Sequence, residues 1–364
     1  MEDLTIRDSA IKFGAGRYRQ ERGLIARLGE ECARFGKKMF IIAGPRSWAA
    51  VEQDLTASME SAGVSWELVI YQGECSSGAA HELASKAAAC GADEIVGIGG
   101  GKNMDLAKAT GYLAGLGVLE IPTSISQCAP FACTSVMYTP DGGKDVTWRY
   151  QREIDGCYLD LDVIAACPAR YMAAGILDAM AKKIEILNGL PDLDLQKTDI
   201  DLYTAYCVAM HTYDVLEREA DQAIEDARAG VATKAIADVA FMNVPITGVI
   251  SNTTRGYNQT QLAHVFYDCV RTLFTREAHD SVHGEIVAVG LFLQLYFNHL
   301  QHMEDDLRKR LIAWEIPHNL AGLGIEPTET NLAAIEEYIV NSRHYNSDDP
   351  EDRQRLREAI HEMV

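Results

Sequence analysis

A glycine-rich segment in the first third of the sequence has the residue types that phosphate binding needs. Gly99, Gly100 and Gly101 end a β-branched run (92–101) and precede a helical pattern. Glycines let a backbone approach a phosphate closely, and a helix N-terminus offers free N–H groups and a positive dipole end. The segment departs from G-x-G-x-x-G, because Lys102 stands at the last glycine position. A phosphate-binding loop and a plain tight turn both remain open on these residues alone.

Asp178 is the second residue with potential chemistry, because it lies within the largely apolar helical segment AAGILDAMAKKIE (173–185). A buried carboxylate is costly unless it is paired or ligates a metal. On position alone, the simpler interpretation is an exposed aspartate that pairs with Lys182, one helical turn further on.

Two histidines, His264 and His283, lie beside apolar helical stretches later in the chain. A histidine in that setting is usually a hydrogen-bonded member of the core. With Asp178 they would form three protein ligands with an open position, the pattern of a catalytic zinc or ferrous site. Spacing in the sequence cannot show that the three residues converge. The other histidines, His279 and His344 among them, show no ligand spacing, and most of them are expected at the surface.

The elements that must position these residues change in character along the chain. A mostly parallel sheet with right-handed crossovers is predicted from β-branched runs that alternate with helical patterns at 37–44, 66–73, 92–101 and 117–124. The Pro-Asp-Gly chemistry within 137–145 predicts a hairpin or turn that leaves this sheet. After about residue 165, helical periodicity continues to the C-terminus.

We therefore predict a Rossmann-like α/β domain over residues 1–164 and an all-α domain over residues 165–364, which agrees with the length of 364 residues. The apolar run IVAVGLFLQLYF (286–297) is interrupted by Gln294 and is too short to span a bilayer, so we expect a buried helix there.

Composition limits the classes of molecule that the protein is expected to bind. The formal net charge of −20 would repel a phosphate backbone, so nucleic acid is not an expected partner. The N-terminus lacks an apolar signal-peptide core, and the nine scattered cysteines form no C-x-x-C pair. We expect a cytoplasmic protein with reduced cysteines, no membrane segment, a small-molecule substrate and assembly into a homo-oligomer.

Taken together, these residues resemble the iron-containing alcohol dehydrogenase superfamily, in its glycerol dehydrogenase branch. The resemblance runs from about Gly14 to His344. It rests on motifs that occur in the same order: GECS (73–76), GIGGGKNMDLAKA (97–109), PTSIS (122–126), SVMYTPDG (135–142), AAGILDAMAKKIE (173–185), AHVFYD (263–268) and HGEIVAVG (283–290). One motif alone would be weak evidence for the resemblance, but the ordered series covers nearly the whole chain.

The resemblance implies the fold that this family shares with the dehydroquinate synthases, with a dinucleotide cleft between the two domains. Asp178, His264 and His283 would hold one divalent metal, for which Zn is the first choice and Fe(II) the second. The residues implied at the NAD or NADP cofactor are Gly99, Gly100, Gly101, Asn103 and Asp105, with Thr123 and Ser126 beside them.

Departures from the family pattern bear on the substrate. Cys128 stands where glycerol dehydrogenases have a polyol-contacting aspartate, and Tyr267 replaces a histidine one turn after the first histidine ligand. The acid that would hold the adenosine ribose is missing, and Arg46 stands nearby, so NADP is not repelled. A subgroup of hydroxycarboxylate dehydrogenases resembles the chain in two of these features, Cys128 and Lys182.

The predicted activity is hydride transfer between NAD(P)(H) and a 2-hydroxy acid/2-oxo acid pair. Lys182 is expected near the rim of the metal pocket, where it would meet the substrate carboxylate, with Cys128 nearby; the alternative is that it turns to solvent or pairs with Glu185. Glycerol or another polyol is the alternative substrate. A dehydroquinate synthase-like lyase is a second alternative, although those relatives use Glu at the first ligand and need many basic residues. A non-catalytic binding protein would be favoured only by a lost ligand.

Overall fold

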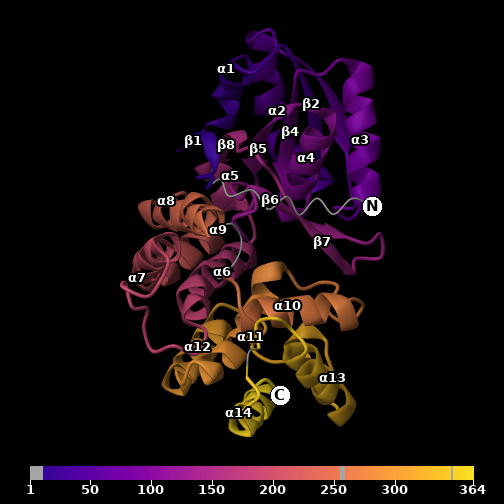
Figure 1. Cartoon of the computed structure of the whole chain (residues 1–364). Helices are drawn as coiled ribbons and strands as arrows, with labels where there is room; N and C mark the ends of the chain where they lie inside the picture. The colour runs from indigo at the N-terminus through magenta and orange to yellow at the C-terminus, as the bar shows by residue number, and fades with distance from the viewer. Residues whose placement is uncertain (1–10, 255–258, 346) are drawn as a thin grey trace.

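The computed structural model describes residues 11–254, 259–345 and 347–364. An α/β half is followed by a helical half, and the two lie one above the other in Figure 1. The α/β half contains a sheet of six parallel strands, in the spatial order β1 (Ala15–Glu21), β8 (Ile154–Asp160), β5 (Gly117–Pro122), β4 (Glu94–Gly99), β2 (Lys38–Ala43) and β3 (Ser65–Ile70).

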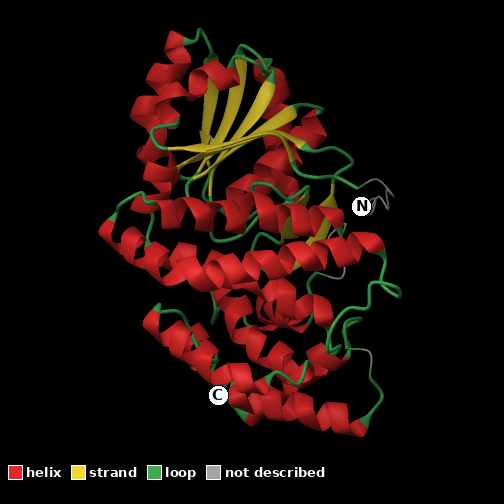
Figure 2. Ribbon diagram, turned by 90° about the vertical axis from the view of Figure 1, so that its left-hand side faces the viewer, coloured by secondary structure: helices red, strands yellow, loops and turns green. Residues whose placement is uncertain are grey.

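Helices cover both faces of this sheet (Figure 2). They are α1 (Leu28–Cys32), α2 (Pro45–Ser61), α3 (Ser77–Cys90) and α4 (Gly101–Ala114). Alternation along β2 divides the core, because successive side chains of a strand point to opposite faces. Met39 and Ile41 share a cluster with α1 and α2, whereas Phe40 and Ile42 share one with α3 and α4.

The four predicted strands are confirmed as β2, β3, β4 and β5, and the predicted hairpin is confirmed as the antiparallel pair β6 (Thr134–Tyr138) and β7 (Lys144–Arg149). Strands β1 and β8 were not predicted, because neither reads as an apolar run. The sequence of β1, AGRYRQE, contains three charged residues and a glycine, and β8 contains both glycine and aspartate. The chain order crosses from β3 over β2 to β4, so the ends of β2 and β4 form the switch point where parallel sheets bind ligands.

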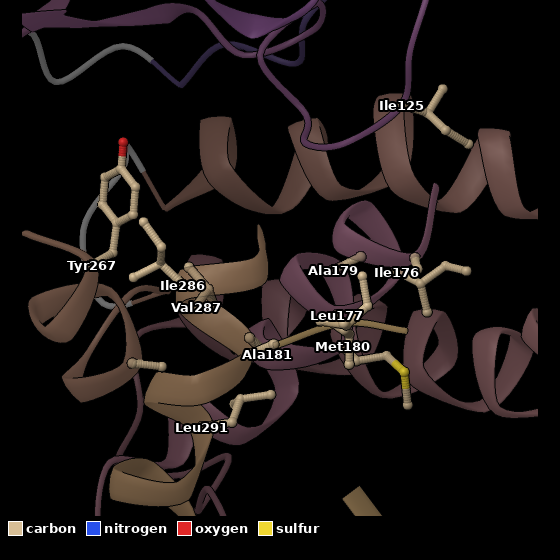
Figure 3. Close-up of a cluster of buried hydrophobic side chains, with 14 of the residues drawn as sticks. Ile125, Ile176, Leu177, Ala179, Met180, Ala181, Tyr267, Ile286, Val287 and Leu291 are labelled. Atoms are coloured by element: carbon tan, nitrogen blue, oxygen red, sulfur yellow. The ribbon is translucent and has the colours of Figure 1, made fainter. Parts of the chain in front are cut away.

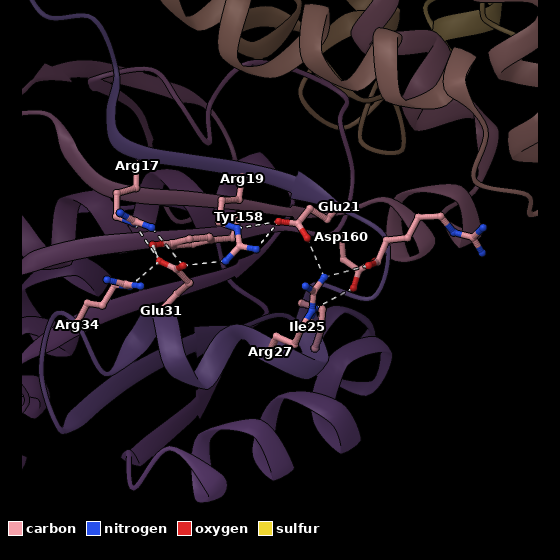
Figure 4. Close-up of polar contacts among 10 residues, drawn as sticks. Arg17, Arg19, Glu21, Ile25, Arg27, Glu31, Arg34, Tyr158 and Asp160 are labelled. Carbon is pink, nitrogen blue, oxygen red and sulfur yellow. Dashed lines mark hydrogen bonds and ion pairs between the residues drawn. The ribbon is translucent and has the colours of Figure 1, made fainter.

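A buried ion cluster holds β1 against the first helices (Figure 4). Glu31 is 2% exposed, and its carboxylate lies 3.0 Å from Arg17, 2.8 Å from Arg19 and 3.3 Å from Arg34. The hydroxyl of Tyr158 donates to the same carboxylate at 3.2 Å. Burial raises the pKa of Glu31, but the arginines outweigh it and hold the pKa below its usual value. The arginines that make β1 look unlike a strand are therefore its anchors.

The second half contains nine α-helices within the described residues, from α6 to α14: α6 (Ala169–Leu187), α7 (Ile200–Ala229), α8 (Lys234–Phe241), α9 (Thr247–Thr253), α10 (Leu262–Leu273), α11 (His283–Phe297), α12 (Glu304–Ala313), α13 (Glu329–Val340) and α14 (Pro350–Glu362). A short helix, α5 (Leu161–Ala166), follows the last strand of the sheet. It straddles the predicted domain boundary at residue 164, so the division at that residue stays a prediction.

Helix α6 is the central helix of this half, with 15 of its 19 residues buried. Leu177 and Ala181 meet Ile286, Val287 and Leu291 of α11 in one apolar cluster (Figure 3). Glycine allows the close approach: a Cβ on Gly284 would lie 2.0 Å from the carbonyl oxygen of Ala174. The two helices can therefore meet backbone to backbone.

The buried helix predicted at 286–297 is confirmed as part of α11. By length and composition, a single run of the described residues, Lys234–Thr253, could cross a membrane, but 72% of its apolar window is buried inside the protein. Such burial is typical of a core helix.

Gly284→Ala should destabilise the protein, because the new methyl group would collide with the backbone of α6 at Ala174. We expect a loss of roughly 1–3 kcal/mol in the free energy of unfolding, the usual range for overpacking, measured as a lower urea midpoint. The matched control is Gly78→Ala in α3, where an added Cβ meets nothing within 4 Å. Equal midpoints for the two variants would show that α11 shifts without loss.

Candidate metal and cofactor site

Three side chains from three helices converge below the sheet. Asp178 comes from the middle of α6, His264 from the first turn of α10, and His283 is the first residue of α11. One ligand atom of each lies within 4.8 Å of the others. Oδ1 of Asp178 is 3.2 Å from Nε2 of His264 and 3.5 Å from Nε2 of His283. The convergence that spacing could not show is present in the structure.

Glu185 orients His264. Its Oε2 lies 2.6 Å from Nδ1 of the imidazole, and its Oε1 accepts the backbone N–H groups of Gln261 at 2.7 Å and His264 at 3.0 Å. Nδ1 therefore faces a carboxylate, and Nε2 faces Asp178. Sequence reasoning did not assign Glu185 to the site. The available signal was its spacing of seven residues from Asp178, which places both on one face of α6.

His283 is held by its own helix start. The carboxylate of Glu285 accepts the backbone N–H of Val282 at 2.9 Å, and Arg170 of α6 binds the same carboxylate at 3.0 and 2.8 Å. The ring of Tyr267 meets the imidazole of His283 edge-on, with 4.3 Å between centroids. These contacts fix where α11 begins and which way its first side chain points.

Lys182 does not lie at the rim of the pocket, which corrects the expectation drawn from the sequence. Its side chain is 3% exposed, and its Nζ lies 3.1 Å from Oδ1 of Asp178 and 3.0 Å from Nε2 of His264. The expected pair with Asp178 exists, but it is buried rather than exposed. A carboxylate in this interior needs a cation at contact distance, which draws the ammonium inward.

The electrostatics of the cluster follow from burial and from this ammonium. Burial alone would raise the pKa of Asp178, but Lys182 and the two imidazoles hold it well below its usual value. Burial lowers the pKa of His283. For His264, burial lowers the pKa, but the carboxylates of Glu185 and Asp178 together raise it above its usual value. The donors of Lys182, 3.0 Å from Nε2, oppose a second proton on this atom, so His264 is best described as the neutral imidazole with its proton on Nδ1.

These residues fit a divalent metal ion. One carboxylate and two imidazoles that can each present an unprotonated nitrogen are the donors that Zn²⁺ and Fe²⁺ take in three-ligand sites. A cavity of about 200 Å³ adjoins the three residues and leaves room for a further ligand. The carboxylate that holds Nδ1 of His264 matches the outer partner that metal-bound histidines usually have.

A second cavity, of about 310 Å³, lies at the N-terminus of α4. Gly100, Gly101 and Asn103 line it together with Ser126, as the cofactor assignment requires. Three residues line both cavities: Gln127, Tyr267 and His283. The two spaces therefore meet beside the candidate metal ligand on α11.

The other residues assigned to the cofactor lie elsewhere. Gly99 ends β4 with a φ of +150°. The hydroxyl of Thr123 donates a hydrogen bond to the hydroxyl of Ser47 at 3.0 Å. Asp105 is buried and bound to Lys108 at 2.9 Å, and it borders the metal cavity rather than the second one. Arg46 is exposed in the first turn of α2. Their roles toward a dinucleotide stay predictions.

Several further residues line the metal cavity without a signal in the sequence. Lys144, Arg149, Arg343 and His344 come from β7 and from the segment after α13. His344, a histidine without ligand spacing in the sequence, is half-buried, and its Nδ1 lies 2.7 Å from Oε1 of Gln261. Cys128 also borders this cavity, and burial raises the pKa of its thiol to about 12, so the group is neutral.

Known proteins resemble the chain in sequence and in structure. The family described as iron-containing alcohol dehydrogenase matches residues 15–154. A glycerol dehydrogenase of Pseudomonas putida is 30% identical over 91% of the chain and 89% of its own length. Hydroxycarboxylate dehydrogenase A of Escherichia coli is 27% identical over 84% of the chain and 83% of its own length. The structure of a probable glycerol dehydrogenase from Sinorhizobium meliloti superimposes with a TM-score of 0.82 at 25% identity, covering 97% of each chain.

Glu185→Gln should weaken metal binding, because it removes the charge that holds Nδ1 of His264. We expect the Zn²⁺ affinity to fall by about 10–100-fold, the usual effect of losing such an outer partner, in competition titrations with a chromophoric chelator. Glu82→Gln on the exposed face of α3 is the control. An unchanged affinity would mean that α10 alone orients the imidazole.

Proposed function

Because the chain belongs to the iron-containing alcohol dehydrogenase family, and is thus an oxidoreductase that acts on CH–OH groups, we propose that it is a metal-dependent dehydrogenase of small alcohols that carry a second oxygen on the neighbouring carbon. Polyols such as glycerol, with their hydroxy-ketones, are the first substrate class. The family assignment leaves the lyase alternative without support.

The observation that carries this proposal is the junction of the two cavities. Gln127, Tyr267 and His283 border both the cavity at the glycine-rich loop and the cavity at Asp178 and His264. A dinucleotide whose phosphates lie at the N-terminus of α4 can reach this junction with its nicotinamide. Hydride transfer requires this contact between cofactor and substrate.

The residues around the two cavities have different roles in the proposed reaction. A divalent ion held by Asp178, His264 and His283 supplies Lewis acidity toward the substrate oxygen. Glu185 keeps Nε2 of His264 directed into the site, and Arg170 with Glu285 keeps His283 at the helix start. Tyr267, whose hydroxyl is hydrogen-bonded to that of Tyr138, stands between the cofactor and substrate spaces and limits the water that enters.

Polyols are placed first because of the relatives. The Pseudomonas putida relative is a glycerol dehydrogenase, and it matches the chain over most of both sequences. The cavity of about 200 Å³ favours a substrate of few carbons. The sequence comparison therefore supports the polyol alternative better than the hydroxy acid that the sequence departures suggested.

A 2-hydroxy acid is the second candidate, and the lining of the cavity favours it. The neutral thiol of Cys128 brings no charge to repel a carboxylate, and Lys144, Arg149 and Arg343 border the same space. Lys144 is paired with Asp268, which reduces its contribution. The Escherichia coli relative is named hydroxycarboxylate dehydrogenase A.

Either dinucleotide suits the cofactor cleft that we propose. No acidic side chain lies within the turn from Gly44 to Arg46 that follows β2, at the switch point of the sheet. A carboxylate there would favour the ribose hydroxyl of NAD, and an arginine accommodates the phosphate of NADP. We infer that the enzyme accepts NADPH as well as NADH.

Replacing Asp178, His264 or His283 by alanine should abolish turnover and remove bound metal while leaving the fold intact. Each side chain supplies one of the three candidate protein ligands found among the described residues, so we expect that none can be spared. Metal content by mass spectrometry and circular dichroism check the two parts. His302→Ala is the control, because this exposed histidine lines a separate cavity that none of the three candidate ligands borders. Full metal content in the three variants would overturn the assignment.

A substrate panel separates the two candidates. We expect dihydroxyacetone to be reduced with a kcat/KM at least about tenfold above that of 2-oxobutyrate, with both NADH and NADPH. A tenfold ratio corresponds to a difference of about 1.4 kcal/mol in transition-state stabilisation between the two substrates. If 2-oxo acids are preferred instead, Arg149→Met should raise their KM selectively, and the second candidate replaces the first. Activity on neither class would contradict both.

A further inference from the structure

The position of Lys182 sets a chemical conflict inside the candidate metal site. An imidazole nitrogen has a single lone pair. Nδ1 of His264 faces Glu185 and carries the proton, so the only lone pair of this ring is on Nε2. The ammonium of Lys182 lies 3.0 Å from that atom and has only donors to offer. The same lone pair cannot accept this hydrogen bond and ligate a metal ion.

Asp178 repeats the conflict on a second atom. Its Oδ1 is the oxygen that faces both imidazoles, and it is also the oxygen that Lys182 binds at 3.1 Å. The ammonium thus holds two of the three atoms that a divalent ion would hold. The ammonium of Lys182 and a divalent ion would also repel each other strongly, since both are cations and would lie a few ångströms apart in a buried site.

We propose that Lys182 is an internal competitor for the divalent ion, so that the ion binds only when the ammonium leaves Asp178 and His264. This inference rests on the metal site of the proposed function. Lys182 borders the cavity of about 200 Å³, which is the space open to its side chain when it moves. The triad of this chain therefore binds a divalent ion more weakly than the same three ligands would without the lysine.

The same geometry gives the lysine a second position. When displaced, its ammonium lies in the cavity that takes the substrate, beside Cys128. There it can donate to a substrate oxygen that does not face the metal ligands. Competition with the ion and contact with the substrate are then two positions of one side chain.

The test is metal affinity in Lys182→Met, which keeps the length of the side chain and removes its charge. Apo-protein is titrated with Zn²⁺ against a chromophoric chelator and with Co²⁺ by its visible absorption. We expect the dissociation constant to fall by roughly tenfold or more, the scale of a charge-assisted hydrogen bond. Zinc should also raise the melting temperature of this variant by more than that of the unaltered protein.

The matched control is the neighbouring residue. Lys183→Met removes an identical charge from the same helix, but that ammonium lies over the ring of Tyr213 at 4.1 Å. Its metal affinity should equal that of the unaltered protein. Lys182→Gln is the second variant, because its amide can still donate to Asp178 if the methionine protein fails to fold without metal. It too should bind the ion more tightly.

The outcomes separate this inference from the proposed function. Equal dissociation constants in the unaltered protein and both Lys182 variants would overturn the competition and leave the metal site standing. No binding in any of the proteins would overturn both the competition and the metal-dependent function. Equal gains in the Lys182 and Lys183 variants would reduce the effect to net charge and would also overturn the competition.

Discussion

The buried carboxylate of Asp178 is the group on which the arrangement of the candidate site depends. A lone carboxylate in this interior would be far more costly than any single apolar contact could offset. Lys182, one turn further along α6, compensates it at 3.1 Å, and His264 of α10 and His283 of α11 bring Nε2 to within 3.2 and 3.5 Å of the same oxygen. The requirement for compensation thus fixes where α10 and α11 begin relative to α6, and these starts in turn define the cavity.

Close backbone contacts make that compensation geometrically possible. Around Asp178, α6 consists largely of alanine and glycine, so neighbouring chains approach without intervening side chains. A Cβ on Gly175 would lie 1.9 Å from the carbonyl oxygen of Ile125, in the loop that follows the sheet. Asn243, in the segment between α8 and α9, donates to the same carbonyl at 3.3 Å. Small residues therefore join the metal cluster to the cofactor loop as well as to α11.

The fold and the identity of the three candidate ligands could be predicted from the sequence, whereas their surroundings could not. Strands such as β4 can be predicted from their local β-branched runs. Strand β1 is instead held by ion pairs between its arginines and Glu31, which belongs to another element of the chain. His344 joins the site only through tertiary packing, and no local pattern marks it. Glu185 shares a helix face with Asp178, but this spacing does not show that its carboxylate meets His264. Lys182 was assigned to the right helix face and to the wrong depth, because spacing gives direction and does not give burial.

That difference in depth changes how the departures from the family pattern should be understood. At the rim, Lys182 would act on the substrate alone, and it would favour acids together with the neutral Cys128. Inside the cluster, the ammonium forms an ion pair with Asp178, so most of its positive charge is balanced by the protein rather than by a substrate. Any preference of the cavity for an anionic substrate would then fall to the other cationic side chains of its lining, Lys144, Arg149 and Arg343. Under the proposed competition, substrate choice and metal retention are linked through one side chain, because the cation that holds Asp178 decides where the other positive charge lies.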